Sequence, residues 1–245
     1  MNSSEVKPYK NEESSKKEQV AKMFNSIAPK YDFLNHTLSL GIDILWRKKA
    51  VKILKNMKPN KVLDIACGTA DFTIANLKSG ANKIVGLDIS EGMVNVGVEK
   101  IKKKGLSKKI SLQVGDSEKI NFDNEEFDAI TVGFGVRNFE NLEKGLSEMF
   151  RVLSPNGKVI ILEFSKPKKF PIRQFYFFYF KYILPRIGRL ISKDKTAYTY
   201  LPDSVNVFPD GEKFTSILEK VGFKETNIIS CSFGIASIYV GTKLQ

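Results

Sequence analysis

Two short apolar segments, each followed by small or acidic residues, constrain this fold more than any other feature. The first, 61–66, breaks into the loop 67–71, and the second, 83–87, delivers Asp88 at its C-terminal end. In an open parallel sheet the carboxyl ends of neighbouring strands border one crevice. There a tight loop can approach a ligand, and an acid can accept hydrogen bonds from two ribose hydroxyls. The pattern predicts a nucleoside-cofactor site.

The loop differs from a dinucleotide-binding loop. A pyrophosphate needs closely spaced glycines and a helix N-terminus without negative charge, whereas only Gly68 is present here and Asp64 and Asp71 flank it. Carboxylates in these positions suit a ligand with cationic groups, such as the sulfonium and ammonium of S-adenosylmethionine (SAM). For the loop alone, a buried strand and turn without a ligand is the alternative.

Strands and helices alternate after this loop, which is typical of a parallel sheet. We expect an α/β fold with helices on both faces of a seven-stranded, mostly parallel sheet whose last strand is antiparallel. Asp210 is expected to cap the last helix. The predicted strands are 61–66, 83–88, 110–114, 127–132, 158–164, 225–231 and 236–241, and the predicted helices are 71–78, 91–104, 141–153 and 210–221.

A length of 245 residues suits one main domain. Residues 1–20 are polar, without the apolar segment of a signal peptide or a membrane anchor, and are predicted to be a disordered tail. The rest divides into an N-terminal helical cap or lid (21–58), a SAM-binding core (59–165), a basic aromatic insertion (166–209) and a closing helix and hairpin (210–245).

The composition limits the partners. The chain has 39 Lys and Arg against 27 Asp and Glu, a net charge of +12, which favours nucleic acid, anionic lipid or an acidic substrate. Its two cysteines and single histidine lack metal-ligand spacing. We therefore expect a reduced, cytoplasmic protein without a metal.

Three loops at the carboxyl ends of the predicted strands carry candidate site residues. Asp88 is a ribose ligand, the alternative being a helix cap, for which Ser90 is better placed. Asp116 could accept a hydrogen bond from the adenine amine, although turn chemistry alone could also place it there. The loop 133–139 lacks the Pro-Pro-aromatic cluster of many nitrogen methyltransferases and instead offers Arg137 to substrate oxygens, or to a surface ion pair.

Several segments together resemble the UbiE/MenG family of quinone C-methyltransferases, which has the class I SAM-dependent methyltransferase fold. The matches lie between residue 23 and about residue 210. One departure is Ala70, where the family usually has glycine, and its methyl group is expected to tighten the loop around the methionine moiety. The matching segments are MFNSIAPKYD at 23–32, NHTLSLG at 35–41, WR at 46–47, the loop at 64–71, FGVRN at 134–138, LEFSKP at 162–167 and LPRIG at 184–188.

The resemblance implies methyl transfer from SAM to a ring carbon of a reduced polyprenyl quinone. Demethylmenaquinol is the favoured substrate, a methoxy-polyprenyl-benzoquinol is the alternative, and a nucleic-acid methyltransferase is a remote rival. A SAM-binding scaffold without catalysis is a further rival. The implied SAM contacts are Thr69, Asp88, Asp116, Ser117 and Gly133, where relatives can carry serine, and from the loop itself we add Asp64 and Gly68.

Carbon methylation needs an electron-rich ring, and an unperturbed phenol titrates near pH 10. We expect Arg137 to stabilise the phenolate and Asn138 to orient its oxygen. His36, the only histidine, is a candidate base, with Tyr31 and Asp32 as competitors. A loop or cap role is the alternative for His36.

The segment 164–195 carries much of the positive charge. It has nine basic residues, one acid and nine aromatic residues, a mixture typical of an interfacial membrane segment. We expect peripheral contact with an anionic membrane, on the inner face of the cytoplasmic membrane, because the substrate implied by the resemblance carries a prenyl tail. Nucleic acid is not expected as a partner. A buried helix and a homodimer surface are the alternatives.

Overall fold

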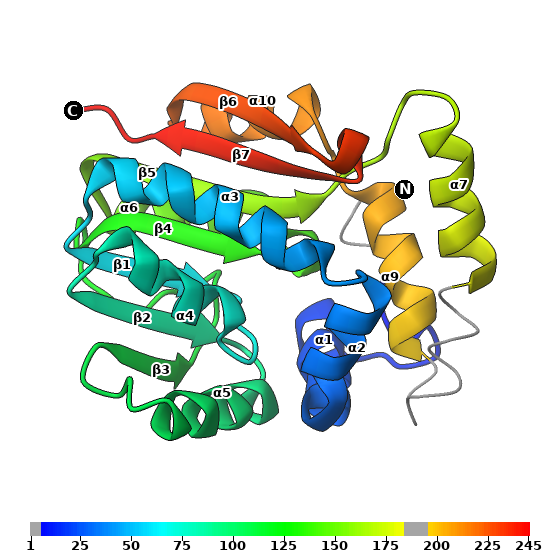
Figure 1. Ribbon diagram of the computed structural model, residues 1–245, viewed down its shortest axis with the longest axis horizontal. Helices are drawn as coiled ribbons and strands as arrows, with labels where there is room; N and C mark the ends of the chain where they lie inside the picture. The colour runs from blue at the N-terminus through cyan, green and yellow to red at the C-terminus, as the bar shows by residue number, and fades with distance from the viewer. Residues whose placement is uncertain (1–5, 184–195) are drawn as a thin grey trace.

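The computed structural model describes residues 6–183 and 196–245, and a seven-stranded sheet runs through it (Figure 1). The strand order is β3-β2-β1-β4-β5-β7-β6. Only β7 runs antiparallel to its neighbours β5 and β6, as expected for the closing hairpin. The strands are β1 (Lys61–Ile65), β2 (Lys83–Asp88), β3 (Ile110–Val114), β4 (Phe127–Gly133), β5 (Leu153–Phe164), β6 (Lys224–Cys231) and β7 (Ala236–Thr242).

The central strands are apolar on both faces because helices cover both. Leu63 and Ile65 of β1 belong to one apolar cluster, with α6 (Leu142–Val152) and α10 (Glu212–Val221). Val62 belongs to the other, with α3 (Ile42–Met57), α4 (Asp71–Asn76) and α5 (Glu91–Lys103). Burial on both sides explains the nearly unbroken apolar runs that made these strands predictable.

The N-terminal cap consists of α1 (Lys16–Ile27), the short 3₁₀ helix η2 (Ala28–Lys30) and α2 (Tyr31–Leu38). These helices lie beside the carboxyl end of the sheet, next to α9 (Thr196–Val207) (Figure 1). The cap therefore stands over the edge where the sequence predicts the cofactor.

The prediction of a disordered tail through residue 20 is wrong for its C-terminal part. Helix α1 begins at Lys16, after a capping box in which Ser15 and Glu18 satisfy each other's backbone N–H groups. Lys16 is only 1% exposed and its ammonium donates to the carbonyl oxygens of Arg137 and Phe139. Composition suggested a solvated chain because these partners lie more than 100 residues away. Residues 1–5 lie outside the described part.

The predicted irregular insertion contains regular structure. Helix α7 (Ile172–Phe178) continues into one π-helical segment (Tyr179–Ile183), and α9 follows residues 184–195, which lie outside the described part. Asp210 does not cap α10, whose N-cap is Gly211. Asp210 instead accepts a 2.9 Å hydrogen bond from the backbone N–H of Lys166 and pairs with the same residue's ammonium.

Asp64 lies fully buried at the centre of the sheet. Its carboxylate accepts hydrogen bonds of 2.6 Å from the hydroxyl of Thr73 and 2.7 Å from that of Thr131. Burial raises the pKa of Asp64 to about 6, because the two hydroxyl groups replace only part of its hydration. Asp64 thus ties the start of α4 to β1 and β4.

This burial predicts a pH-dependent stability. A raised folded-state pKa favours the protonated carboxyl, so the stabilising contribution is complete below the unfolded pKa of 3.8 and is lost as the pH rises through about 6. Relative to Asp64→Asn, which keeps the shape without the charge, the wild-type free energy of unfolding should fall by about 2–3 kcal/mol between pH 3.5 and 7. Urea unfolding across this pH range measures the difference in free energy of unfolding between the wild type and Asp64→Asn. A difference that does not change with pH would contradict the raised pKa of Asp64.

Candidate functional site

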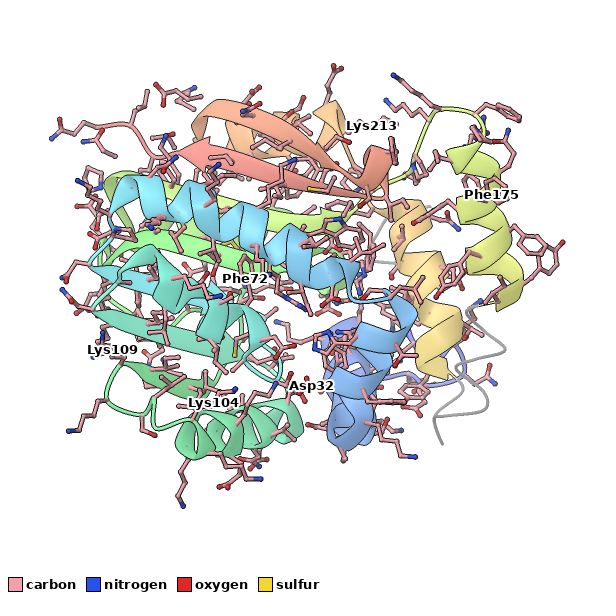
Figure 2. The ribbon with its side chains drawn as sticks, viewed as in Figure 1. Asp32, Phe72, Lys104, Lys109, Phe175 and Lys213 are labelled. Atoms are coloured by element: carbon pink, nitrogen blue, oxygen red, sulfur yellow. The ribbon has the colours of Figure 1, made fainter. Side chains whose placement is uncertain are left out.

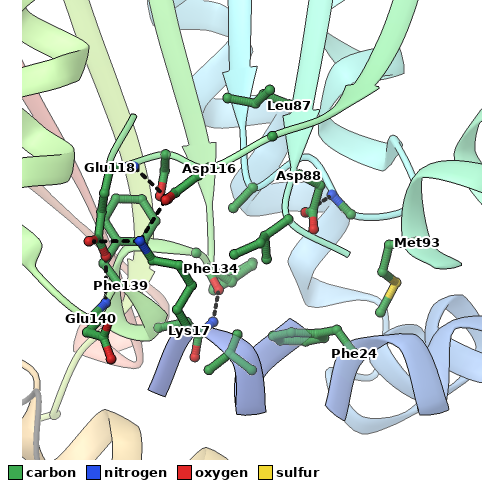
Figure 3. A pocket seen from close by; sticks show the side chains of 18 of the residues that line it. Lys17, Phe24, Leu87, Asp88, Met93, Asp116, Glu118, Phe134, Phe139 and Glu140 are labelled. Atoms are coloured by element: carbon green, nitrogen blue, oxygen red, sulfur yellow. Dashed lines mark hydrogen bonds and ion pairs between the residues drawn. The ribbon is translucent and has the colours of Figure 1, made fainter. Parts of the chain in front are cut away.

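Two cavities lie at the carboxyl edge of the sheet. The smaller, about 70 Å³, is the strand-edge cavity, and it opens among the ends of β1, β2 and β4 (Figure 3). The larger, about 370 Å³, is the apolar cavity, and it lies between the cap, the end of β5 and α7 and α9. Phe24, Tyr31 and Phe134 line both. The predicted site residues that line the strand-edge cavity are Tyr31, Gly68, Asp88, Asp116, Ser117, Gly133 and Asn138.

The glycine loop and Asp88 form one unit. Gly68 adopts the left-handed conformation, with φ +55°, and donates its N–H to Asp88 over 2.7 Å. The other carboxylate oxygen accepts from the backbone N–H of Ser90 over 2.8 Å. Ser90, not Asp88, caps α5, as the sequence suggested. The pKa of Asp88 is raised by burial, yet two backbone donors hold its carboxylate at the cavity wall.

Asp116 is engaged by the cap. The ammonium of Lys17, from the first turn of α1, lies 2.6 Å from the Asp116 carboxylate and 3.3 Å from that of Glu118 (Figure 3). Asp116 also accepts the Glu118 backbone N–H over 2.8 Å. Together these carboxylates raise the pKa of Lys17, although partial burial opposes them. Lys17 therefore occupies the hydrogen-bonding position at Asp116 for which the sequence analysis predicts an adenine amine.

Two of the expected cofactor ligands are not among the described residues that line this cavity. Asp64 faces Thr73 and Thr131 inside the sheet. Thr69 is buried, and its hydroxyl donates to Asp32 in the cap. Asp64 and Thr69 thus stabilise the glycine loop through hydrogen bonds outside the lining of this cavity.

Gly133 has a steric explanation, whereas nothing in the backbone conformation at residue 70 explains Ala70. Ala70 adopts φ +72°, which favours glycine. A Cβ at Gly97 of α5 would lie 3.3 Å from the Ala70 Cβ, so the methyl group faces this helix. The expected tightening around the methionine moiety is therefore not what the methyl does. A Cβ at Gly133 would lie 2.9 Å from the ring of Phe72, which fits glycine in place of serine.

The turn η4 (Val136–Asn138) points neighbouring side chains into different cavities. Asn138 lines the strand-edge cavity and Arg137 the apolar one. Nη1 of Arg137 donates to Glu163 over 2.8 Å and also to the carbonyl oxygen of Phe134. The Arg137 guanidinium lies 5.4 Å from the ring centre of Phe164. The surface ion pair considered for Arg137 is instead a buried one, with Glu163 fully enclosed.

Glu163 was not assigned a role from the sequence. Its carboxylate accepts from the guanidinium and backbone N–H of Arg137 and from the backbone N–H of Phe164. Burial raises the pKa of Glu163, whereas the Arg137 charge lowers it. The available signal was a lone acid at the end of an apolar strand, because a carboxylate in such a run needs a buried cationic partner.

His36 lies away from both cavities and lines a separate surface hollow. Its Nδ1 is 3.1 Å from Asp43 and its Nε2 is 3.2 Å from Asp71. Asp32, the competing base, is paired with Lys100 over 2.6 Å. These contacts connect the cap to the core, and they place neither His36 nor Asp32 where a substrate proton could be taken from the apolar cavity.

Tyr31 is the candidate base that stands at the junction of the cavities. A Cβ built on Gly68 would lie 3.9 Å from its ring, so the aromatic face covers the glycine loop. Burial raises the pKa of Tyr31, although Asn35 partly opposes this through a side-chain hydrogen bond. At neutral pH the hydroxyl therefore stays protonated, so Tyr31 has no phenolate that could act as a base.

Sequence comparisons match the chain to one family. The model of the ubiE/COQ5 methyltransferase family matches residues 12–243. A Bacteroides fragilis protein named demethylmenaquinone methyltransferase is 49% identical, with 97% of each chain covered. A Porphyromonas gingivalis protein of the same name is 40% identical, over 97% of this chain and 98% of the relative. A Geobacter sulfurreducens protein named ubiquinone/menaquinone biosynthesis C-methyltransferase UbiE is 44% identical, over 93% and 90%.

Solved structures share the fold. A Thermotoga maritima SAM-dependent methyltransferase, described as a possible histamine N-methyltransferase, superposes with a TM-score of 0.64 at 17% identity and covers 91% of this chain and 99% of that one. A putative SAM-dependent methyltransferase from Methanococcus maripaludis gives 0.62 at 21% identity, with 94% of each chain covered. The fold is that of class I SAM-dependent methyltransferases, as predicted.

Proposed function

The chain belongs to the ubiE/COQ5 methyltransferase family, and we propose that it methylates a ring carbon of demethylmenaquinol with SAM as the methyl donor. The two curated relatives named above for demethylmenaquinone, at 49% and 40% identity, support this substrate. A methoxy-polyprenyl-benzoquinol is the second candidate, because a relative at 44% identity carries both quinones in its name.

The observation that carries this proposal is the junction between the two cavities. The strand-edge cavity has carboxylates from β2 and from the loop after β3, whereas the apolar cavity is walled by aromatic rings. Tyr31 and Phe134 line both. A polar methyl donor and an apolar ring can therefore meet there.

The residues of the strand-edge cavity fit SAM. We assign Asp88 to the ribose hydroxyls, Asp116 and Ser117 to the adenine, and Gly68 and Gly133 to the close approach of backbone. Asp64 and Thr69 support the glycine loop. SAM supplies a methyl group on an electrophilic sulfonium. A cavity of about 70 Å³ is small for a nucleoside, and displacement of the Lys17 side chain from Asp116 would enlarge it.

Replacing Lys17 by methionine should strengthen SAM binding about three- to tenfold. The change removes the ammonium that competes for Asp116 and leaves the length of the side chain almost unchanged. Isothermal titration calorimetry measures the dissociation constant. Lys22→Met is the matched control, because Lys22 lies on the same helix and pairs with the exposed Glu12. Equal or weaker SAM binding in Lys17→Met would show that Lys17 does not compete with adenine.

Arg137 is proposed to hold a ring oxygen of the quinol. The paired Glu163 neutralises much of the guanidinium charge, so Arg137 acts mainly by directing N–H groups at the oxygen as negative charge develops there. Asn138 lines the strand-edge cavity, and its buried Oδ1 has no hydrogen-bond partner among the described residues. This oxygen is therefore placed to orient the methyl donor where the two cavities meet. The apolar walls exclude water from the reacting carbon.

The direct test is methyl transfer from labelled SAM to each reduced quinone. We expect demethylmenaquinol to be methylated and its oxidised form not, because only the quinol has an oxygen that can push electrons into the ring. Methylation of the benzoquinol alone would show that the benzoquinol, and not demethylmenaquinol, is the substrate. Methylation of neither would overturn it.

The same assay tests Arg137. Arg137→Gln is best made together with Glu163→Gln, so that no buried charge is left without a partner. Compared with the wild type, the double variant should lose about 10²–10³-fold in kcat. SAM affinity should stay within about threefold, and an unchanged kcat would contradict the role.

We further propose that the segment around α7 contacts an anionic membrane. Phe170, Phe175 and Phe178 are 80%, 69% and 55% exposed. Phe175 lies on α7 (Figure 2) and also lines the apolar cavity. Exposed lysines at 168 and 169 flank them. No helix within the described ranges is long and apolar enough to cross a bilayer. Because Phe175 of α7 is exposed and also lines the apolar cavity, a prenyl tail bound in this cavity could extend past α7 into the lipid.

Vesicle flotation tests this contact. The protein should float with phosphatidylglycerol vesicles and less with phosphatidylcholine vesicles. A Phe170→Ser/Phe178→Ser variant should lose most of the binding, whereas Val98→Ser, at an exposed apolar position on α5, should bind normally. Binding that both variants retain would exclude α7 as the contact.

A further inference from the structure

Tyr200 of α9 carries a buried hydroxyl group. The residue is 4% exposed, and its oxygen has no hydrogen-bond partner in the part of the chain that the structure describes. Tyr200 lines the apolar cavity. A buried hydroxyl that makes no hydrogen bond destabilises the folded state, and such a group calls for an explanation.

The position of Tyr200 is fixed by packing. It belongs to an apolar cluster with Val20, Met23 and Ile27 of α1, and α9 also packs against η4. Arg137 lines the same cavity as Tyr200, and its charge lowers the pKa of Tyr200 whereas that of Glu163 raises it. Burial is the largest effect and raises the pKa, which keeps the hydroxyl neutral and able both to donate and to accept.

Another buried tyrosine of the chain provides a contrast. Tyr239 is fully enclosed, and its oxygen accepts the backbone N–H of Gly211 over 2.8 Å. It belongs to the cluster beneath α10, away from the cavities. The hydroxyl of Tyr239 therefore has a structural role, whereas that of Tyr200 makes no hydrogen bond within the described residues.

We propose that the Tyr200 hydroxyl binds an oxygen of the quinol beside Arg137. This inference rests on the proposed function and adds a specificity residue to it. In a cavity whose walls are mainly apolar, the ring could slide or rotate without changing its contacts. A hydrogen bond at the Tyr200 hydroxyl, next to η4, gives the ring one orientation. The site thereby prefers aromatic rings that carry a hydroxyl over rings of the same shape without one.

The test uses Tyr200→Phe, which deletes one oxygen from a packed position. Its melting temperature should equal or exceed that of the wild type, because an unsatisfied buried group disappears. For demethylmenaquinol, kcat/KM should fall about tenfold, mostly through KM, while the SAM dissociation constant stays unchanged. Tyr239→Phe should show the reverse pattern, with lower stability and unchanged KM.

A binding experiment separates this inference from the proposed function. Titration with 1,4-naphthalenediol, kept reduced, and with naphthalene compares two rings of the same shape. The wild type should bind the diol at least fivefold more tightly, and Tyr200→Phe should lose most of this preference while binding naphthalene equally well. An unchanged preference overturns the role of Tyr200 even where the wild type methylates quinol. If the wild type does not methylate the quinol but still binds the diol more tightly than naphthalene, and loses this preference in Tyr200→Phe, only the proposed substrate is overturned.

Discussion

The buried ion pair between Arg137 and Glu163 fixes the geometry on which both cavities depend. It ties η4 to the last residues of β5, and the same turn receives the Lys16 ammonium of α1 at the carbonyl oxygens of Arg137 and Phe139. The turn η4 is thus bound both to the sheet, through Glu163, and to the cap, through Lys16. Because the pair is buried, removal of either member alone would leave an uncompensated charge, so the turn has little freedom to move.

The sheet could be predicted from sequence because its information is local. Apolar runs such as 61–65 and 83–87 are buried on both faces, and glycines end several of the helices between them. Asp88 was identifiable for the same reason, since a strand end alone determines its position. The predicted start of β5, residue 158, is five residues too late, because the composition of Ser154 to Gly157 is typical of a turn although the strand runs through them.

Residues whose roles depend on distant partners could not be predicted. Lys16 and Lys17 look like part of a solvated tail, yet one is buried against η4 and the other is paired with Asp116. His36 looks like a base, but two carboxylates from α3 and α4 hold it in a link between cap and core. Tyr200 gave no signal at all, because an orphan hydroxyl is visible only when its surroundings are known.

Helix α1 connects the two halves of the site. Lys17, Val20 and Phe24 line the strand-edge cavity, whereas Met23, Phe24 and Ile27 line the apolar one. The helical repeat alone produces these two faces, because residues three and four apart share a side. The walls of both cavities therefore include one continuous helix, capped at Ser15, so a displacement of this helix would change the shape of both cavities.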